Sequence, residues 1–260
     1  MTLAACAAPP PPPPVAAAPP PQIRSGQGID LATDTGYFLN ELKGSRLDFV
    51  ARYYREPDSR WPALSAGEAR LLSAAGLKIV AVWESHSQHP THFTFASGYG
   101  DATKAYLEAK AIGQPPGSAI YFAVDFNARG RWVEAVDDYF RGVAAGLTAA
   151  GGGKSDYAVG VYGSGAVCAE VKGAGLARYA WLSNSLAWDG SLGYQDWNIR
   201  QSGRTAPLSF NHDADEARAE YGGFQVASTG DLGPFGSAQA SNSVGWAPAG
   251  APQQLSAALR

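Results

Sequence analysis

The chain has 260 residues with 20 basic and 23 acidic side chains, and its net charge of −3 comes without a Lys/Arg cluster that would attract nucleic-acid phosphates. No apolar run approaches the roughly 18 to 20 residues of a membrane-spanning helix. The two cysteines, Cys6 and Cys168, exclude a disulfide framework and a cysteine-based metal site, so we expect neither a nucleic-acid partner nor a membrane span.

Residues 1–26 are predicted to form an Ala/Pro-rich, disordered leader and spacer. Of the 18 prolines in the chain, 9 lie at positions 9–14 and 19–21, and 7 of the other 12 residues among the first 21 are alanine. Because such a segment buries too little apolar surface to offset the entropy of ordering, it should stay extended and polyproline-like.

The run Leu3-Ala4-Ala5-Cys6 resembles the lipobox of bacterial lipoproteins, in which the chain is cut before the cysteine and that cysteine is acylated. The basic and apolar stretches of a signal peptide do not precede it, since only five residues come before Cys6. Two interpretations stay open: the true start lies upstream and Cys6 carries a lipid, or the match is accidental. Contact with a membrane is expected only through that lipid.

Residues 27–224 are predicted to form one domain, which is enough chain for one sizeable core. Its first five strands are short, rich in β-branched or aromatic residues and bounded by Gly or polar residues. They are predicted at residues 28–31, 48–54, 78–84, 119–126 and 158–163.

Helices are predicted between these strands. Ser65 and Glu68 form a capping box in which both side chains accept from exposed N–H groups, and Gly76 supplies a left-handed stop. Apolar residues at helical spacing predict the other helices, which are a segment from Asp101 to Gly113, a stripe from Trp132 to Leu147, and a shorter helix at 166–172.

Three further strands are predicted at 179–184, 194–201 and 208–213, with gaps too short for packed crossover helices. Five βα units followed by three strands predict an α/β fold, a degenerate TIM-type barrel in a single domain. The alternative, an open doubly wound sheet, needs a Gly-rich phosphate turn that Gly28-Ile29-Asp30-Leu31 does not provide. Residues 225–260 are predicted to be a Gly/Ser/Ala-rich flexible tail.

Four carboxylates lie at the predicted strand ends, where the βα loops of such a barrel converge: Asp30, Glu84, Asp125 and Asp213. One Asp at a strand end commonly caps the next helix, but four on separate strands indicate a shared site. Converging carboxylates bind a hard metal ion or act as acid and base on a glycosidic bond, and mutual repulsion keeps one of them protonated.

Aromatic residues near the strand ends favour the sugar interpretation, because flat apolar faces beside hydrogen-bonding groups fit a sugar ring. Trp83, Tyr54, Tyr162 and Trp181 are the candidates, although the same rings also suit the filling of a small barrel. The spacing of His86, His89 and His92 matches no zinc pattern, and no loop of EF-hand form follows Asp213. We therefore predict no metal and no cofactor.

Several segments carry motifs in a fixed order, namely Gly28-Ile29-Asp30, the stretch from Leu64 through Gly76 to Lys78-Ile79-Val80-Ala81-Val82-Trp83-Glu84, Ile120-Tyr121-Phe122-Ala123-Val124-Asp125-Phe126, Gly160-Val161-Tyr162-Gly163-Ser164, and Trp197-Asn198-Ile199-Arg200-Gln201. Together they resemble the bacterial glycoside-hydrolase-like domain known as domain of unknown function 1906, over about residues 27–224. That family is similar to the family 25 lysozymes, whose barrel has five βα units and three strands.

The resemblance implies roles for individual residues. Asp30 and Asp213 match aspartates at the first and last strands of the lysozymes, and Asp125 matches the first acid of their Asp-x-Glu. The expected glutamate, the catalytic acid, is Asn127 here, and an amide cannot protonate a leaving group. Glu84 is then the best remaining acid, with Asp125 as its electrostatic or nucleophilic partner. The expected substrate-binding residues are Trp83, Tyr54, Asn127, Tyr162, Trp181 and Gln201.

We thus expect an extracellular or surface-tethered monomer that hydrolyses peptidoglycan or a related wall polysaccharide. Asn127 favours an alternative, a non-catalytic wall-glycan-binding module that has lost the lysozyme-type acid. A metal-dependent or other activity is the third possibility.

Overall fold

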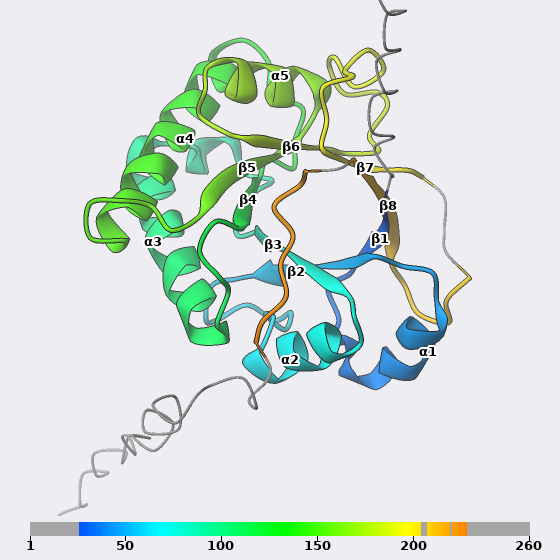
Figure 1. The fold of residues 1–260 in the computed structure, drawn as a ribbon. Helices are drawn as coiled ribbons and strands as arrows, with labels where there is room; N and C mark the ends of the chain where they lie inside the picture. Colours follow the sequence, from blue (N-terminus) through cyan, green and yellow to red (C-terminus); the bar gives the residue numbers. More distant parts are fainter. Residues whose placement is uncertain (1–25, 204–206, 219, 228–260) are drawn as a thin grey trace, which may run out of the picture.

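The computed structural model describes residues 26–203, 207–218 and 220–227. Eight strands close into one barrel in chain order, with the helices outside it (Figure 1). The predicted degenerate TIM-type barrel is therefore confirmed. The predicted leader with Cys6 and the tail beyond residue 227 lie outside the described residues.

The first seven strands run parallel, and the last one runs antiparallel to both of its neighbours. The strands are β1 Gly26–Asp30, β2 Phe49–Tyr54, β3 Lys78–Trp83, β4 Ala119–Ala123, β5 Ala158–Gly163, β6 Tyr179–Leu182, β7 Ile199–Gln201 and β8 Asp213–Ala217. Because β8 is reversed, its first residue pairs with the last residue of β1, Asp213 with Asp30.

The strand predicted at 208–213 is wrong, since β8 begins at residue 213. The apolar residues that suggested a strand serve another purpose. Phe210 stacks on Phe38 with ring centroids 4.2 Å apart, and Leu208 packs against the core between barrel and helices. Their hydrophobicity reflects packing of a loop, which sequence spacing alone does not distinguish from a short buried strand.

Helices follow each of the first five strands. They are η1 Thr35–Phe38, α1 Leu39–Gly44, α2 Ala66–Ala74, η2 Pro90–His92, α3 Phe95–Ile112, α4 Arg131–Ala150 and α5 Gly165–Gly173. Turns and irregular segments, without helices, join β6, β7 and β8 in the described part of the chain. No helix among the described residues is long and apolar enough to cross a membrane.

Helix α2 begins with half of the predicted capping box. Ser65 Oγ accepts from the Glu68 N–H at 3.1 Å, and Gly76 follows the helix with a φ of 84°. The Glu68 carboxylate has a different role from the predicted one, because it accepts from Arg52 Nε at 2.6 Å and Thr35 Oγ1 at 2.7 Å. Arg52 is fully buried, and a buried cation without a counter-charge costs more free energy than an uncapped N–H group at a helix end. The Glu68 carboxylate therefore pairs with Arg52.

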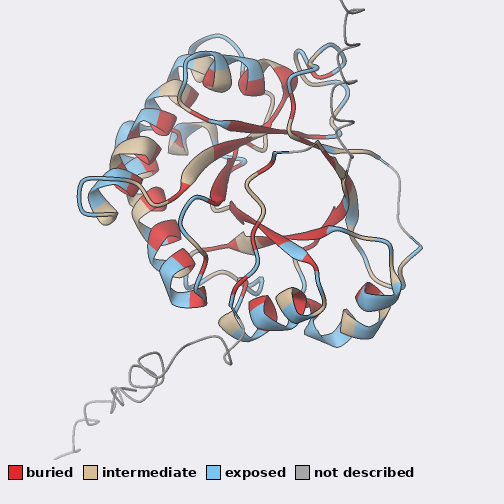
Figure 2. Cartoon of the chain, in the orientation of Figure 1, coloured by how far each residue is buried: buried red, intermediate tan, exposed pale blue. Residues whose placement is uncertain are grey.

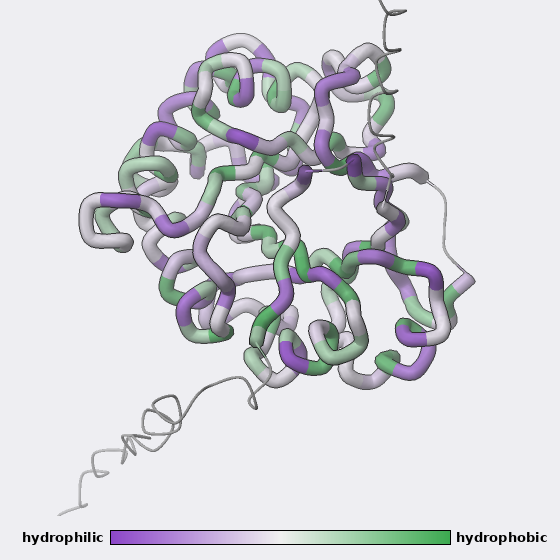
Figure 3. The backbone as a smooth tube through the Cα atoms, viewed as in Figure 1, coloured by the Kyte–Doolittle hydropathy of each residue, from purple (hydrophilic) through white to green (hydrophobic). Residues whose placement is uncertain are grey.

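Buried and hydrophobic residues lie on the barrel strands and on the helices around them (Figures 2 and 3). Alternation along the strands divides this core into two layers. One set of strand side chains packs against the helices, and the other set fills the barrel. Glycines make room for the interior rings: a Cβ on Gly28 would lie 2.3 Å from the Phe49 ring, and one on Gly160 would lie 2.4 Å from the Tyr121 ring.

The segment after β8, orange in Figure 1, closes the barrel at the N-terminal ends of its strands. Phe224 exchanges two backbone hydrogen bonds with Ile79, at 2.7 and 2.9 Å. The Tyr121 hydroxyl, inside the barrel, donates to the Tyr221 carbonyl at 2.9 Å. The Val226 N–H still donates to Ser73 Oγ of α2, so the packed chain continues through residue 226.

Candidate functional site

A pocket of about 320 Å³ opens at the rim where β1–β7 end and β8 begins. Most of its lining is polar, and it contains four carboxylates. The lining residues are Asp30, Tyr53, Val82, Glu84, Ala123, Asp125, Tyr162, Trp181, Asn184, Ser185, Gln201 and Asp213. A larger cavity, of about 1360 Å³, lies on the outer face of β6–β8 and β1 and shares Asn184 and Gln201 with this pocket.

The pocket brings together all four predicted carboxylates. Asp30 ends β1, Glu84 directly follows β3, and Asp125 lies two residues beyond β4. Asp213 was predicted to end its strand, but it is the first residue of β8. It still reaches the same rim, because the antiparallel direction of β8 places its N-terminal end beside the C-terminal end of β1.

Asp30 lies on the pocket floor with two hydrogen-bond donors. Tyr53 Oη donates to it at 2.6 Å and Gln201 Nε2 at 2.9 Å. Burial raises the pKa of Asp30 to about 6, although both hydrogen bonds oppose the increase. Asp215 lies deeper and accepts from Trp181 Nε1 at 3.0 Å. Burial and the neighbouring Asp30 raise the pKa of Asp215 well above its usual range, so it is the member of the pair that keeps a proton.

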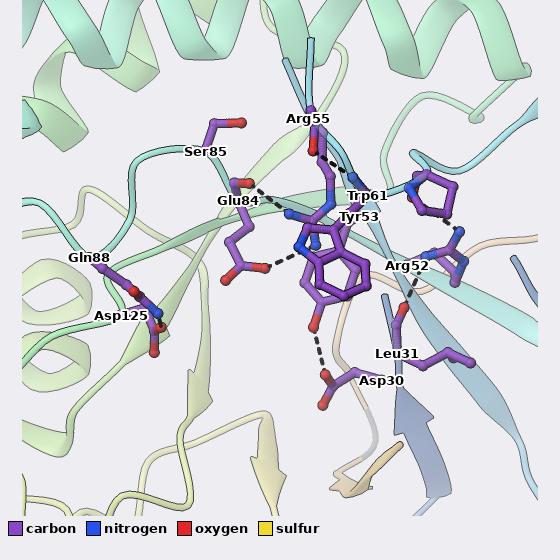
Figure 4. Close-up of polar contacts among 12 residues, drawn as sticks. Asp30, Leu31, Arg52, Tyr53, Arg55, Trp61, Glu84, Ser85, Gln88 and Asp125 are labelled. Atoms are coloured by element: carbon purple, nitrogen blue, oxygen red, sulfur yellow. Dashed lines mark hydrogen bonds and ion pairs between the residues drawn. The ribbon is translucent and has the colours of Figure 1, made fainter. Parts of the chain in front are cut away.

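Glu84 has the properties of a general acid. Burial raises its pKa to about 7, Arg55 opposes the increase, and Asp125 and Asp30 add to it. Figure 4 shows its carboxyl group between the Asp125 side chain and the Tyr53–Asp30 pair. A carboxyl group with this pKa is substantially protonated near neutral pH and can donate that proton.

Asp125 forms the opposite side of the pocket together with the loop between β3 and α3. Its Oδ2 accepts from Gln88 Nε2 at 2.6 Å, and its backbone N–H donates to the Ser87 carbonyl at 3.0 Å. The loop that follows Glu84 therefore also positions Asp125.

Three of the predicted substrate-binding residues lie in the pocket, namely Tyr162, Trp181 and Gln201. The Tyr162 hydroxyl donates to Gln201 Oε1 at 3.1 Å, and Gln201 Nε2, on the other side of the same amide, donates to Asp30 Oδ2. These contacts orient the polar groups along one side of the rim.

The other three predicted residues do not line the pocket. Tyr54 and Trp83 point outward into the layer between barrel and helices, because their strand neighbours Tyr53 and Val82 occupy the inward positions. Tyr54 donates to Gln114 Oε1 at 2.7 Å, and Trp83 is 1% exposed.

Asn127 lies outside the pocket as well. Its Oδ1 accepts from the Asp189 backbone N–H at 3.0 Å, so the amide joins two loops. The position that matches the lysozyme acid therefore has a structural contact in this chain.

Sequence reasoning missed Tyr53, Arg55 and Asp215. The two-residue period of a strand carries a signal for two of them. Tyr53 shares a face with Ala51, and Asp215 shares one with Asp213, so inward alternation would have placed both beside the predicted carboxylates. Arg55 follows the end of β2, and its contact with Glu84 has no sequence signal.

The described residues contain no group of three or more His, Cys, Asp or Glu side chains that could hold a metal ion. The histidines of the predicted loop pack on one another and on nearby groups. The rings of His86 and His92 lie 5.0 Å apart, and His92 Nε2 is 2.9 Å from Asp101 Oδ2.

Comparison with known proteins links this site to a family. The model of the Rv2525c-like, glycoside hydrolase-like domain matches residues 40–231. The uncharacterized protein YbfG of Bacillus subtilis (strain 168) is 32% identical over 131 residues, which are 49% of this chain and 18% of YbfG. The chain thus spans about a fifth of the length of this curated relative.

The chain is also similar to solved structures of lower identity. The Tat-secreted protein Rv2525c of Mycobacterium tuberculosis, in complex with HEPES, has a TM-score of 0.63 and 21% identity, over 76% of this chain and 98% of that chain. A family 25 lysozyme from Aspergillus fumigatus has a TM-score of 0.47 and 11% identity, over 75% of this chain and 94% of that chain. With the family model covering most of the barrel, the chain belongs to the Rv2525c-like family of glycoside hydrolase-like domains.

Proposed function

We propose that the pocket hydrolyses glycosidic bonds of a cell-wall glycan, peptidoglycan or a related polysaccharide, with Glu84 as the general acid and Asp125 as its carboxylate partner. One observation carries the proposal: the carboxyl group of Glu84, with 26% of its side chain exposed and a pKa of about 7, lines the same pocket as Asp125 and Asp30. Two carboxyl groups of different protonation are the minimum that this chemistry needs.

In the proposed reaction Glu84 protonates the glycosidic oxygen as the bond from that oxygen to the anomeric carbon breaks. Asp125 stabilises the positive charge that develops on the sugar, or attacks the anomeric carbon. A water molecule then supplies the new anomeric hydroxyl group, displacing the Asp125 carboxylate if it has bonded to that carbon, and its second proton returns to Glu84. Asp30, held by Tyr53 and Gln201, adds negative charge beneath the reacting sugar.

We also propose an extracellular or surface location for the domain. The family description supports a glycan substrate, and the relative Rv2525c is Tat-secreted. A lipid on Cys6 followed by a Pro-rich spacer would hold a monomeric barrel at a distance from a membrane, within reach of the wall.

The alternative function is a wall-glycan-binding module without catalysis. The contact between Asn127 and Asp189 favours it, because the position of the lysozyme-type acid then serves only to join two loops. In that case the carboxylates and the rings of Tyr162 and Trp181 would bind the sugar without cleaving it.

Purified peptidoglycan incubated with the full chain distinguishes these functions. We expect release of reducing ends, and a loss of about 100-fold or more in Glu84→Gln, because general acid catalysis contributes on that scale. Asp125→Asn should be similarly impaired, whereas Glu134→Gln, an exposed carboxylate on α4, should behave like the parent. Release that persists in both pocket variants would remove the assignment, and binding without release would favour the module.

A further inference from the structure

We propose that Arg55 is a positioning residue for this site, which holds the Glu84 carboxyl group and the Tyr53 ring in one fixed arrangement. The inference rests on the proposed function, because Glu84 is its acid. Arg55 itself does not line the pocket and acts through the two residues that do.

The guanidinium group lies beside the Glu84 carboxyl group and against the Tyr53 ring (Figure 4). Its carbon is 4.4 Å from the centroid of the Tyr53 ring. One terminal nitrogen donates to the Glu84 main-chain carbonyl at 3.3 Å, and the other donates to Glu84 Oε2 at 3.4 Å. Arg55 therefore contacts the backbone and the carboxyl group of Glu84 together, which restricts the rotation of that side chain.

The backbone around Arg55 is itself fixed from two directions. The Arg55 N–H donates to both oxygens of Glu108 on α3, at 3.3 and 3.4 Å. The next N–H, of Glu56, donates to Ser85 Oγ, one residue after Glu84, at 3.1 Å. The end of β2 is thus joined to α3 and to the loop that carries the acid.

Arg55 also contributes the positive charge nearest to Glu84. No lysine, arginine or histidine lines the pocket in the part of the chain that the structure describes. Arg55 is 9% exposed, so water screens its charge little. It favours the ionised form of Glu84, whereas burial and the neighbouring carboxylates favour the protonated form. Arg55 therefore keeps the pKa of Glu84 close to neutral pH, so that this group can both donate and regain a proton.

Arg55 is also connected to Asp30, through Tyr53. The Tyr53 ring lies beneath the guanidinium group, and the Tyr53 hydroxyl donates to Asp30 Oδ1 at 2.6 Å. A planar guanidinium stacks on an aromatic ring in a way that an ammonium group cannot reproduce. Displacement of Arg55 should therefore loosen two carboxyl groups of the pocket at once.

Carbon-detected NMR titration of the carboxyl groups in the full chain tests the proposal without any need for turnover. The Glu84 signal is identified by its loss in Glu84→Gln. Arg55→Met, which keeps a side chain of similar length without charge, should raise the pKa of Glu84 by about 1 unit or more, the scale of a nearby opposite charge. Arg55→Lys should return the pKa toward that of the parent. Arg141→Met, which breaks an exposed pair with Asp138 on α4, is the matched control and should leave it unchanged.

An unchanged Glu84 titration in Arg55→Met would overturn the proposal, as would an equal increase in Arg55→Lys. Circular dichroism shows whether each variant is folded, and if Arg55→Met is not, Arg55→Gln replaces it. Where wall glycan is hydrolysed, the alkaline limb of the rate profile should move upward in Arg55→Met, with kcat reduced more than KM is raised. If the parent releases no product, the proposed function fails while the titration still decides the role of Arg55.

Discussion

Glu84 has a carboxyl group whose folded-state pKa, about 7, lies above its ordinary value of 4.5. Between these two values the folded chain binds more protons than the unfolded chain, so stability falls as the pH rises through the window. Below pH 4.5 both states are protonated and the cost is absent. An acid tuned for proton donation near neutral pH therefore destabilises the fold at the pH where it ionises.

Glu84→Gln should flatten this part of the stability profile. Its free energy of unfolding should fall less between pH 5 and pH 8 than that of the parent, by about 1 to 3 kcal/mol, because one unit of pKa shift corresponds to about 1.4 kcal/mol. Urea denaturation at the two pH values measures the difference, with Glu134→Gln as the exposed control. Parallel profiles for Glu84→Gln and the parent would show that Glu84 titrates normally in the fold.

At the scale of the elements, a buried ion pair joins β2 to α2. The side chains of Arg52 and Glu68 are 0% and 1% exposed, and Arg52 Nη1 also donates to the Leu31 carbonyl after β1. The same pair explains why the Glu68 carboxylate does not complete the capping box. It also holds the loop after β1 beside the start of α2, close to Asp30.

Glu68→Gln should destabilise the chain by about 3 to 5 kcal/mol, because it leaves the Arg52 cation buried without a counter-charge. Arg141→Met removes an exposed pair and should cost no more than about 1 kcal/mol. Thermal and urea denaturation of both variants give the comparison. Equal costs for the two would mean that the buried pair contributes no more than a surface one.

At the scale of the whole molecule, the segment after β8 closes the end of the barrel opposite the pocket. Tyr221 and Phe224 are 7% and 4% exposed, and they contact β2, β3 and β4 through packing and backbone hydrogen bonds. The barrel is therefore closed at this end only when a segment late in the chain packs against strands from its first half.

A chain that ends at residue 220 should be markedly less stable than one that ends at residue 227. The loss of two buried aromatic side chains costs about 3 kcal/mol or more, and the Ile79 and Ala119 backbone groups also lose their partners. Comparison of the melting temperatures of the two truncated chains with that of the full chain measures the effect. If the chain ending at 220 melted with the others, the proposed domain limit at residue 224 would be too long.

The pattern of residues predicted the barrel because local signals agreed with one another. Short β-rich segments alternate with amphipathic helices that have their own caps, such as Ser65 and the left-handed Gly113, and such units pack in few ways. The bounds of β8 could not be predicted from local signals. Phe210 and Leu208 give the same hydrophobic pattern whether they pack from a strand or, as here, from a loop.

The sequence by itself determined the fold class, the family resemblance and the convergence of Asp30, Glu84 and Asp125 on one rim, because strand ends in a parallel barrel converge regardless of detail. Asp213 lies at the same rim for another reason, since the antiparallel β8 begins beside the end of β1. Only the tertiary structure decided that Tyr53 rather than Tyr54 faces the pocket, that Asp215 lies behind Asp30, and that Arg55 reaches Glu84. Those outcomes depend on the phase of each strand and on contacts between separate elements. Side-chain direction and burial, which set the pKa of Glu84 and Asp30, exist only once the barrel has closed.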